Sequence, residues 1–286
     1  MARIINQTRR CLKGARVVLE HPSVLKRRKY IFLLSHPRAY TTLLSHILGS
    51  HPEISGYAET WRSYRTPRDL LKLRCAVCSH GNYKPNCTYF LDKMLHNWLQ
   101  ISDSILNRND IDYIFMIRRP VPTIKSMIAL YRKYIEQGGT IESSTLPPTV
   151  EGAVVHYSNR LSFLVGVSAR LRRRSKRAIV VRAEDLISRP FSVLSELQTF
   201  LHLRSALNEH YSVFDRTGEW YYSDTSDFIR QGKIERERPA HAEISIPGEL
   251  ADKANCEYEQ CLAALTDSFP LAPAKDTDSA SIASEA

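Results

Sequence analysis

The sequence predicts an α/β fold in three layers, with helices on both faces of a central parallel sheet. Apolar, β-rich runs alternate with helical patterns, which favours crossovers from strand to helix to strand. Two of these runs end in Arg and Pro and lead directly into a helix. With 286 residues, of which 43% are hydrophobic, the chain is long enough and apolar enough to form the core of one large domain. We expect a basic N-terminal extension (1–29), the α/β domain (30–272) and a disordered C-terminal tail rich in Ser, Ala and Asp (273–286).

The N-terminal extension carries clustered basic side chains, at Arg9, Arg10, Lys13 and Arg16 and again over 26–29. We expect a basic helix packed on the domain; the alternative is a peripheral contact with an anionic membrane surface. The sequence holds no run of about eighteen apolar residues and no leader with an apolar core. The expectation is therefore a cytoplasmic protein.

The first strand, Tyr30–Leu34, is followed by a break at Pro37 and a new apolar helix. Such a junction gathers unpaired backbone N–H groups and the positive end of the helix dipole, which together bind phosphate or sulfate. Arg38 adds a cationic fork, and Thr41 and Thr42 add hydroxyl donors. The stretch lacks glycine and has Arg where the Walker A motif has Lys, which disfavours an ordinary kinase or NTPase. The plainer alternative is a turn whose threonines cap the helix.

The second unit of this kind is the run 111–117, which ends in Arg and Pro. The helix after it has apolar residues at helical spacing, namely Ile124, Met127, Ile128, Tyr131 and Ile135. Arg118 at the strand end and Ser126 on the helix are expected to converge on one phosphate at the edge of the sheet. A further strand over 178–181 and a helix over 191–201 continue the alternation.

Several dispersed segments, in a fixed order, resemble the sulfotransferases that use 3'-phosphoadenosine 5'-phosphosulfate (PAPS). The stretch 37–42 is similar to the 5'-phosphosulfate loop of that family, P-R-S-G-T-T, and Arg118-x-Pro120 with Ser126 is similar to its 3'-phosphate site. The resemblance implies a fold like that of the P-loop nucleoside triphosphate hydrolases. Tyr40 stands where the family has Gly, and it would crowd the phosphosulfate if its backbone needed a positive φ.

The segment 50–60 is similar to one in tyrosylprotein sulfotransferases and bacterial relatives, and this resemblance implies Glu59 as the catalytic base. The stretch 90–93 resembles a strand that ends in a lysine on the bridging oxygen, which implies that role for Lys93. His96 is expected as a second polar group facing the acceptor. The plainer alternatives are a solvated loop carboxylate for Glu59 and a surface lysine on an amphipathic helix for Lys93.

Two later segments extend the resemblance. In 181–186, Ala183 replaces the aromatic of the [YF]-E-D-L motif, so we expect Glu184 and Asp185 to act only as structural anchors. The stretch 229–234 resembles the late loop that closes over the nucleotide. The residues implied in co-substrate binding are Arg38, Ala39, Tyr40, Thr41, Thr42, Arg118, Ser126, Arg230, Gly232 and Lys233, and those implied in catalysis are Glu59, Lys93 and Arg38.

The resemblance implies transfer of a sulfuryl group from PAPS to an acceptor hydroxyl by in-line displacement, with release of adenosine 3',5'-bisphosphate. The implied acceptor is a small molecule or a glycan: a carbohydrate, a phenol or another metabolite. No metal is expected. The aromatic residues Trp61, Tyr64 and 220–222 are candidates for lining the acceptor site, although such residues more often pack in a core or loop.

Two other classes of function stay open. A net charge of +10 and a dense basic run over 172–177 suit a nucleic-acid-binding protein, but no motif of that class accompanies them, and we expect no nucleic acid as partner. Tyr40 keeps open a nucleotide-binding protein without catalysis. The group Cys75, Cys78, His80 and Cys87 is compatible with a zinc site and also with a loop of free thiols.

Overall fold

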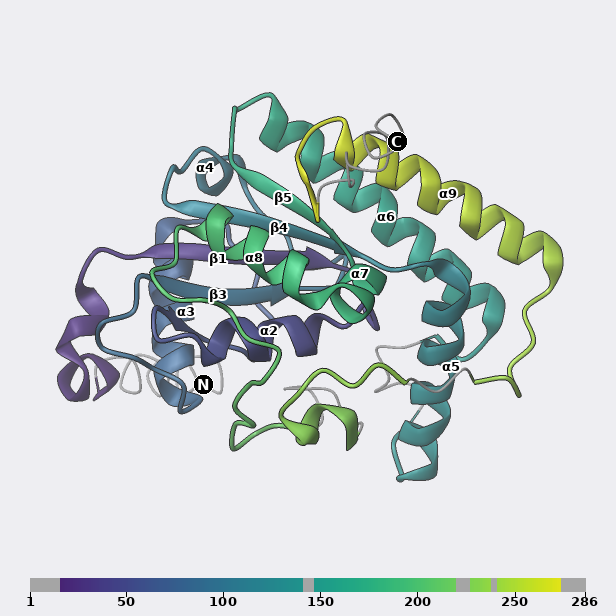
Figure 1. The fold of residues 1–286 in the computed structure, drawn as a ribbon, viewed down its shortest axis with the longest axis horizontal. Coiled ribbons are helices and arrows are strands. Elements are labelled where there is room, and N and C mark those ends of the chain that lie inside the picture. The colour runs from purple at the N-terminus through teal and green to yellow at the C-terminus, as the bar shows by residue number, and fades with distance from the viewer. Residues whose placement is uncertain (1–15, 141–146, 220–226, 238–240, 274–286) are drawn as a thin grey trace, which may run out of the picture.

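The computed structural model describes residues 16–140, 147–219, 227–237 and 241–273. A six-stranded parallel sheet with the strand order β2-β3-β1-β4-β5-β6 forms its centre (Figure 1). The strands are β1 (Lys29–Ser35), β2 (Ile54–Ser55), β3 (Tyr89–Met94), β4 (Ile111–Ile117), β5 (Ala178–Arg182) and β6 (Leu271–Ala272). The helices are η1 (Pro22–Leu25), α2 (Thr41–Ser50), α3 (Pro67–Ser79), α4 (Asp103–Leu106), α5 (Pro120–Glu136), α6 (Val150–Arg172), α7 (Ala183–Ser188), α8 (Pro190–Leu201), η2 (Asp227–Gln231) and α9 (Gly248–Thr266).

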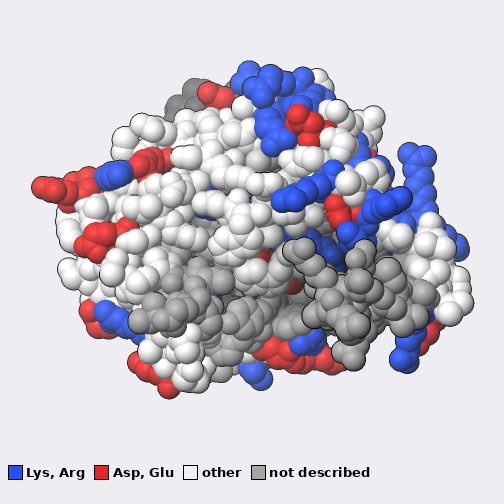
Figure 2. All heavy atoms as spheres, turned by 180° about the vertical axis from the view of Figure 1, so that it is seen from behind, with Lys and Arg blue, Asp and Glu red and all other residues white. Residues whose placement is uncertain are grey.

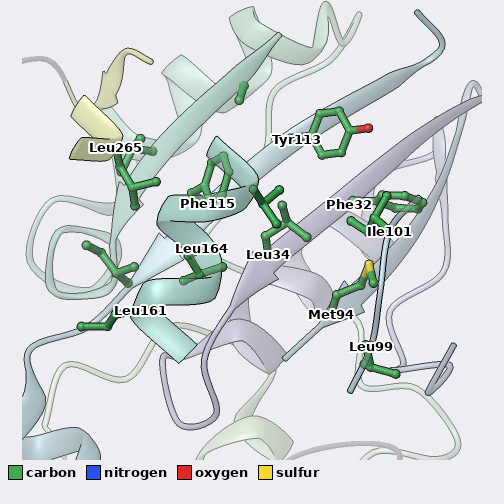
Figure 3. Close-up of a cluster of buried hydrophobic side chains, with 14 of the residues drawn as sticks. Phe32, Leu34, Met94, Leu99, Ile101, Tyr113, Phe115, Leu161, Leu164 and Leu265 are labelled. Atoms are coloured by element: carbon green, nitrogen blue, oxygen red, sulfur yellow. The ribbon is translucent and has the colours of Figure 1, made fainter. Parts of the chain in front are cut away.

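The strands are continuous apolar runs because helices cover both faces of the sheet. Successive side chains of β1 point to opposite faces: Phe32 and Leu34 join the cluster that includes α6 and α9, and Ile31 and Leu33 join the cluster that includes α2 and α8. Figure 3 shows the first cluster, where Leu34 and Phe115 from the sheet lie beside leucines of α6. The predicted three-layer α/β fold is confirmed.

The predicted strands agree closely with the observed ones. The run 30–34 lies within β1, the run 111–117 coincides with β4, and the run 178–181 lies within β5. The predicted helix 191–201 is α8, which begins one residue earlier, at a proline in its first turn. Lys93 belongs to β3, so the alternative of an amphipathic helix at this place is wrong.

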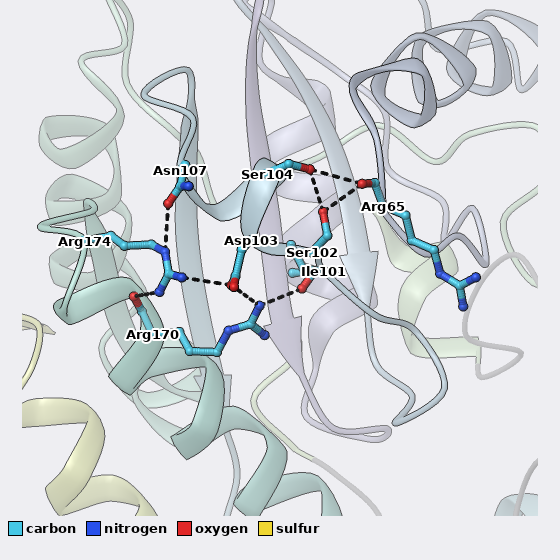
Figure 4. Close-up of polar contacts among 8 residues, drawn as sticks. All are labelled: Arg65, Ile101, Ser102, Asp103, Ser104, Asn107, Arg170 and Arg174. Carbon is cyan, nitrogen blue, oxygen red and sulfur yellow. Dashed lines mark hydrogen bonds and ion pairs between the residues drawn. The ribbon is translucent and has the colours of Figure 1, made fainter.

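The basic run at the end of α6 forms contacts within the protein. Asp103 of α4 accepts hydrogen bonds or ion pairs from Arg170 at 2.6 Å and Arg174 at 2.9 Å, and Arg174 also donates to Asn107 (Figure 4). Figure 2 shows Lys and Arg gathered at one end of the face it presents, with acidic side chains among them. Part of this charge therefore fastens α4 to α6, although such exposed pairs contribute little stability individually.

Residues 1–15 and 274–286 lie outside the described residues, and with them about half of the predicted basic extension (1–29) and nearly all of the predicted disordered tail (273–286). Within the described part, Val17 packs against the domain and Leu19 is largely exposed. No described helix combines the length and apolar character needed to cross a membrane.

Candidate functional site

Four strands bring their candidate side chains to one edge of the sheet. Arg38 follows β1, Glu59 follows β2, Lys93 is near the end of β3, and Arg118 follows β4. From β1 the chain goes to β2, the outermost strand on one side of the sheet, and from β3 it later passes to β4 on the other side of β1. In open α/β sheets, a reversal of this kind at the carboxyl ends of the strands is where ligands bind.

The loop between β1 and α2 has two left-handed residues that are not glycine. Arg38 has φ 65° and Tyr40 has φ 58°, with the buried Ala39 between them. The first hydrogen bond of α2 runs from the Leu44 N–H to the Tyr40 carbonyl at 3.1 Å, so the N–H groups of 41–43 precede the helical ladder. The loop therefore does require a positive φ at residue 40, at a free-energy cost of roughly 1–2 kcal/mol for a side chain other than glycine.

Around this loop, the structure brings together four of the residues predicted to bind the co-substrate. The Arg38 Nε donates to the Ser126 Oγ on α5 at 2.9 Å. The Arg118 guanidinium donates to the Arg38 carbonyl at 2.9 Å and to the Tyr40 hydroxyl at 2.7 Å. It also stacks 4.1 Å from the centre of the Tyr40 ring. The Tyr40 side chain is thus turned toward Arg118, away from the line of α2.

The backbone of Arg118 is held by two side chains that we did not predict. Its N–H donates to the His36 Nε2 at 3.0 Å, and its carbonyl accepts from the Tyr157 hydroxyl at 2.6 Å. Because the Pro37 carbonyl can only accept, the His36 Nδ1 must carry the proton of the neutral ring. Burial lowers the pKa of His36 to about 3, which keeps the ring neutral. The ends of β1 and β4 are joined by this imidazole.

Glu59 and Lys93 are both buried, with 7% and 2% of their surfaces exposed. Glu59 is therefore no solvated loop carboxylate. Burial raises its pKa to about 8, Asp92 adds to the rise, and Lys93 and Arg160 oppose it. The Lys93 Nζ lies 3.3 Å from the Thr42 Oγ1, at the start of α2. A carboxyl group of raised basicity and a buried ammonium group thus lie on the β3 side of the loop.

Asp92 fastens the segment after β2 to β3. Its carboxylate accepts from the Thr60 N–H at 2.9 Å, the Thr60 hydroxyl at 2.6 Å and the Tyr64 hydroxyl at 2.5 Å. These bonds fix the residue that follows Glu59. Tyr64 is fully buried among core residues, so its predicted alternative role as core packing is confirmed.

Arg160 is a third residue that we did not predict from the sequence. It is fully buried on α6 and donates to the carbonyls of Ser35 at 2.6 Å and His96 at 3.1 Å, and to that of Met94. Burial lowers its pKa to about 9, and the charge of Glu59 opposes this. The signal in the sequence is an arginine on the apolar stripe of a helix, next to buried Tyr157 and Leu161.

The later segments make local contacts. Arg230 packs against Gly218, where an added Cβ would lie 2.4 Å from its guanidinium, and Lys233 pairs with Glu235 at 3.3 Å. Their predicted nucleotide contacts therefore stay predictions. The predicted anchor roles of Glu184 and Asp185 are confirmed. Glu184 accepts a hydrogen bond from the Arg119 N–H, and Asp185 accepts from the side chains of Arg182 and Arg189.

The cysteines bear on the zinc alternative. Cys75 and Cys78 lie on α3, and Cys87 is buried before β3. Burial raises the pKa of all three thiols, that of Cys78 to about 12. Within the part of the chain that the structure describes, no three His, Cys, Asp or Glu side chains are grouped so that they could hold a metal ion.

Comparison with protein families finds one match, over residues 30–75, to the model described as the sulfotransferase family. The matched segment runs from β1 through the loop, α2 and Glu59 into α3. Comparison with curated proteins finds none that matches. The match therefore covers the loop between β1 and α2 and the buried carboxyl group, whereas Lys93, Arg118 and Arg160 lie outside it.

Proposed function

From the sulfotransferase match of residues 30–75, we propose that the protein transfers a sulfuryl group from PAPS to an acceptor hydroxyl and releases adenosine 3',5'-bisphosphate. The observation that carries the proposal is the convergence of Arg38, Tyr40, Arg118 and Ser126 beside the start of α2. Two arginines and the first N–H groups of a helix suit a ligand with two separate anionic ends.

In this proposal the two ends of the donor bind to different parts of the loop. The N–H groups at the start of α2, the hydroxyls of Thr41 and Thr42, and Arg38 hold the phosphosulfate. Arg118 and Ser126 hold the 3'-phosphate, which is the group that separates this donor from ATP. Binding both ends fixes the direction of the sulfur–oxygen bond that breaks, and positioning of this kind supplies much of the rate in related group transfers.

The chemical step uses Glu59 and Lys93. The acceptor oxygen forms a bond to sulfur while the bond from sulfur to the bridging oxygen breaks, and the bonding electrons leave on the phosphate of the released nucleotide. The acceptor proton passes to Glu59, whose raised basicity suits a proton acceptor near neutral pH. Lys93 stands beside Thr42 at the start of α2, where its charge stabilises the leaving phosphate.

The test is calorimetric titration with adenosine 3',5'-bisphosphate, beside adenosine 5'-phosphate and ATP. We expect micromolar or tighter binding that depends on the 3'-phosphate, and a loss of that dependence in Arg118→Ala. The matched control is Arg173→Ala, which removes the same charge from an exposed position at the end of α6. Equal binding of all three nucleotides, or an equal effect of both substitutions, would reject the proposed donor site.

A basic nucleic-acid-binding protein is the rival class. Its affinity would fall steeply with salt and would not depend on a 3'-phosphate in a mononucleotide. The same titrations, repeated with a generic oligonucleotide at two salt concentrations, separate the two.

A further inference from the structure

Glu59 and residues near it carry buried polar atoms that form no hydrogen bond with another described residue. Four such atoms are Glu59 Oε1, His96 Nδ1, Asn97 Oδ1 and His156 Nε2. The His96 Nε2 is 3.6 Å from the Glu59 Oε1, the His96 and His156 rings are 6.5 Å apart, and Asn97 follows His96 in the chain. Buried polar groups are nearly always hydrogen-bonded in folded proteins, so a group of unpaired ones indicates a ligand or a functional role.

Flat aromatic rings lie beside these atoms. Trp61 and His96 stack with ring centres 4.7 Å apart and planes at 19°, and His96 and Trp98 stack at 4.3 Å and 13°. Trp98 is nevertheless 50% exposed, which is unusual for so large an apolar side chain. Trp61 is held with φ 55°, a strained backbone for this residue. His96 therefore lies beside the buried carboxyl group, and Trp98, which stacks on it, reaches the surface.

The groups along this stack are uncharged. Burial lowers the pKa of His96 to about 3 and also lowers that of His156, so both rings are neutral, with one donor and one acceptor nitrogen each. A neutral imidazole matches a hydroxyl group, which both donates and accepts. A phosphate or carboxylate, which can only accept, would pair with the donor nitrogen and leave the acceptor nitrogen of the ring unpaired.

We propose that Trp61, His96, Trp98 and His156 form the acceptor subsite, and that it takes a neutral sugar ring. This inference rests on the proposed function. The apolar face of the ring packs on Trp98, one hydroxyl reaches Glu59 for sulfation, and neighbouring hydroxyls pair with His96, Asn97 and His156. A phenol, the other main acceptor class, has one hydroxyl and would satisfy Glu59 while it left the other three atoms unpaired.

The reaction at this subsite is balanced by groups already named. The sugar oxygen gains the bond to sulfur, its proton goes to Glu59, and the bridging oxygen leaves with the bonding electrons on the nucleotide.

The experiment compares two sets of acceptors with PAPS: methyl glycosides of galactose, glucose and mannose, and the phenols 4-nitrophenol and N-acetyltyrosine amide. Release of adenosine 3',5'-bisphosphate gives turnover, and saturation-transfer NMR with the bisphosphate present gives glycoside binding without turnover. We expect a glycoside to bind and react, and Trp98→Ala to raise its KM about ten-fold with little change in kcat. Phe191→Ala, which removes an even more exposed aromatic from α8, is the matched control.

The outcomes separate this inference from the proposed function. If the bisphosphate binds but no glycoside binds or reacts, or if only phenols react, the sugar subsite is wrong while the donor site stands. If Trp98→Ala behaves like Phe191→Ala, or weakens bisphosphate binding as much as glycoside binding, the aromatic stack is not part of an acceptor site. His156→Phe serves as a second variant, and thermal melting of each variant identifies any that fails to fold. If the bisphosphate does not bind, the proposed function fails and the inference falls with it.

Discussion

Tyr40 offers the sharpest test of the proposed donor site, because it differs from the glycine expected there and contacts Arg118 in two ways. Tyr40→Phe keeps the ring stacked 4.1 Å from the guanidinium but removes the hydroxyl that accepts from it at 2.7 Å. A hydrogen bond to a charged group contributes about 1.5–3 kcal/mol when buried, and less where water can replace it. We take about 1.4 kcal/mol for this half-buried pair. Without the hydrogen bond, the Arg118 side chain loses its fixed direction, and we expect the Kd for adenosine 3',5'-bisphosphate to rise about ten-fold.

Tyr40→Gly separates this effect from backbone strain. Glycine relieves roughly 1–2 kcal/mol at φ 58° but also removes the stacking on Arg118, which contributes about 0.5–2 kcal/mol, and the hydrogen bond taken above as about 1.4 kcal/mol. We therefore expect its free energy of unfolding to fall by about 1 kcal/mol relative to the wild type, while the bisphosphate binds at least as weakly as in Tyr40→Phe.

The assay is the ratio of two Kd values, for adenosine 3',5'-bisphosphate and adenosine 5'-phosphate, measured by calorimetry for each variant. Only the first should change, because Arg118 is proposed to bind the 3'-phosphate. If both Kd values rise together, Tyr40 shapes the whole loop and does not position Arg118. If neither changes, the contact between the two side chains has no part in binding.

Four further predictions concern buried charges. Glu59→Gln should lower turnover by roughly two to four orders of magnitude with bisphosphate affinity nearly unchanged, and wild-type kcat/KM should rise with pH up to about 8; a flat profile argues against Glu59 as base. Because the pKa of Glu59 is raised in the folded state, the free energy of unfolding of the wild type should fall as the pH rises from about 4.5 to 8. Urea titrations should not show this fall for Glu59→Gln. Arg160→Met should destabilise the fold by about 3–5 kcal/mol, since buried carbonyls lose their donor, and a loss under 1 kcal/mol in denaturant would contradict that role. Asp92→Asn should lower the melting temperature by several degrees, because the amide cannot accept from every donor there, whereas the exposed Asp103→Asn should change it little.

The fold could be predicted because its strongest signals are local. β1 and β4 are short apolar runs, each followed at once by a helix, and such a pattern has few other solutions. Arg38 and Arg118 could be placed at one edge of the sheet for the same reason, since parallel strands end together. Lys93 was ambiguous between strand and helix, because the apolar residues around it fit both periods.

What the sequence could not supply depends on contacts between distant residues. Arg160 meets carbonyls more than sixty residues away, and the His36 ring is identified as an acceptor only once β4 lies beside β1. The positive φ of Tyr40 is likewise set by the neighbours of the loop, since residue type alone argues against it. Long-range pairing of this kind leaves no periodic trace in the chain.

The arrangement around Arg160 limits what protein engineers could transplant. The matched segment 30–75 includes the loop between β1 and α2 and Glu59, yet the carbonyl that ends β1 is held by Arg160 of α6, and Arg38 of the loop is held by Ser126 of α5. A graft of that segment into another scaffold would arrive without either partner. The smallest portable unit would have to include β4, α5 and α6, which is most of the sheet and its helical cover.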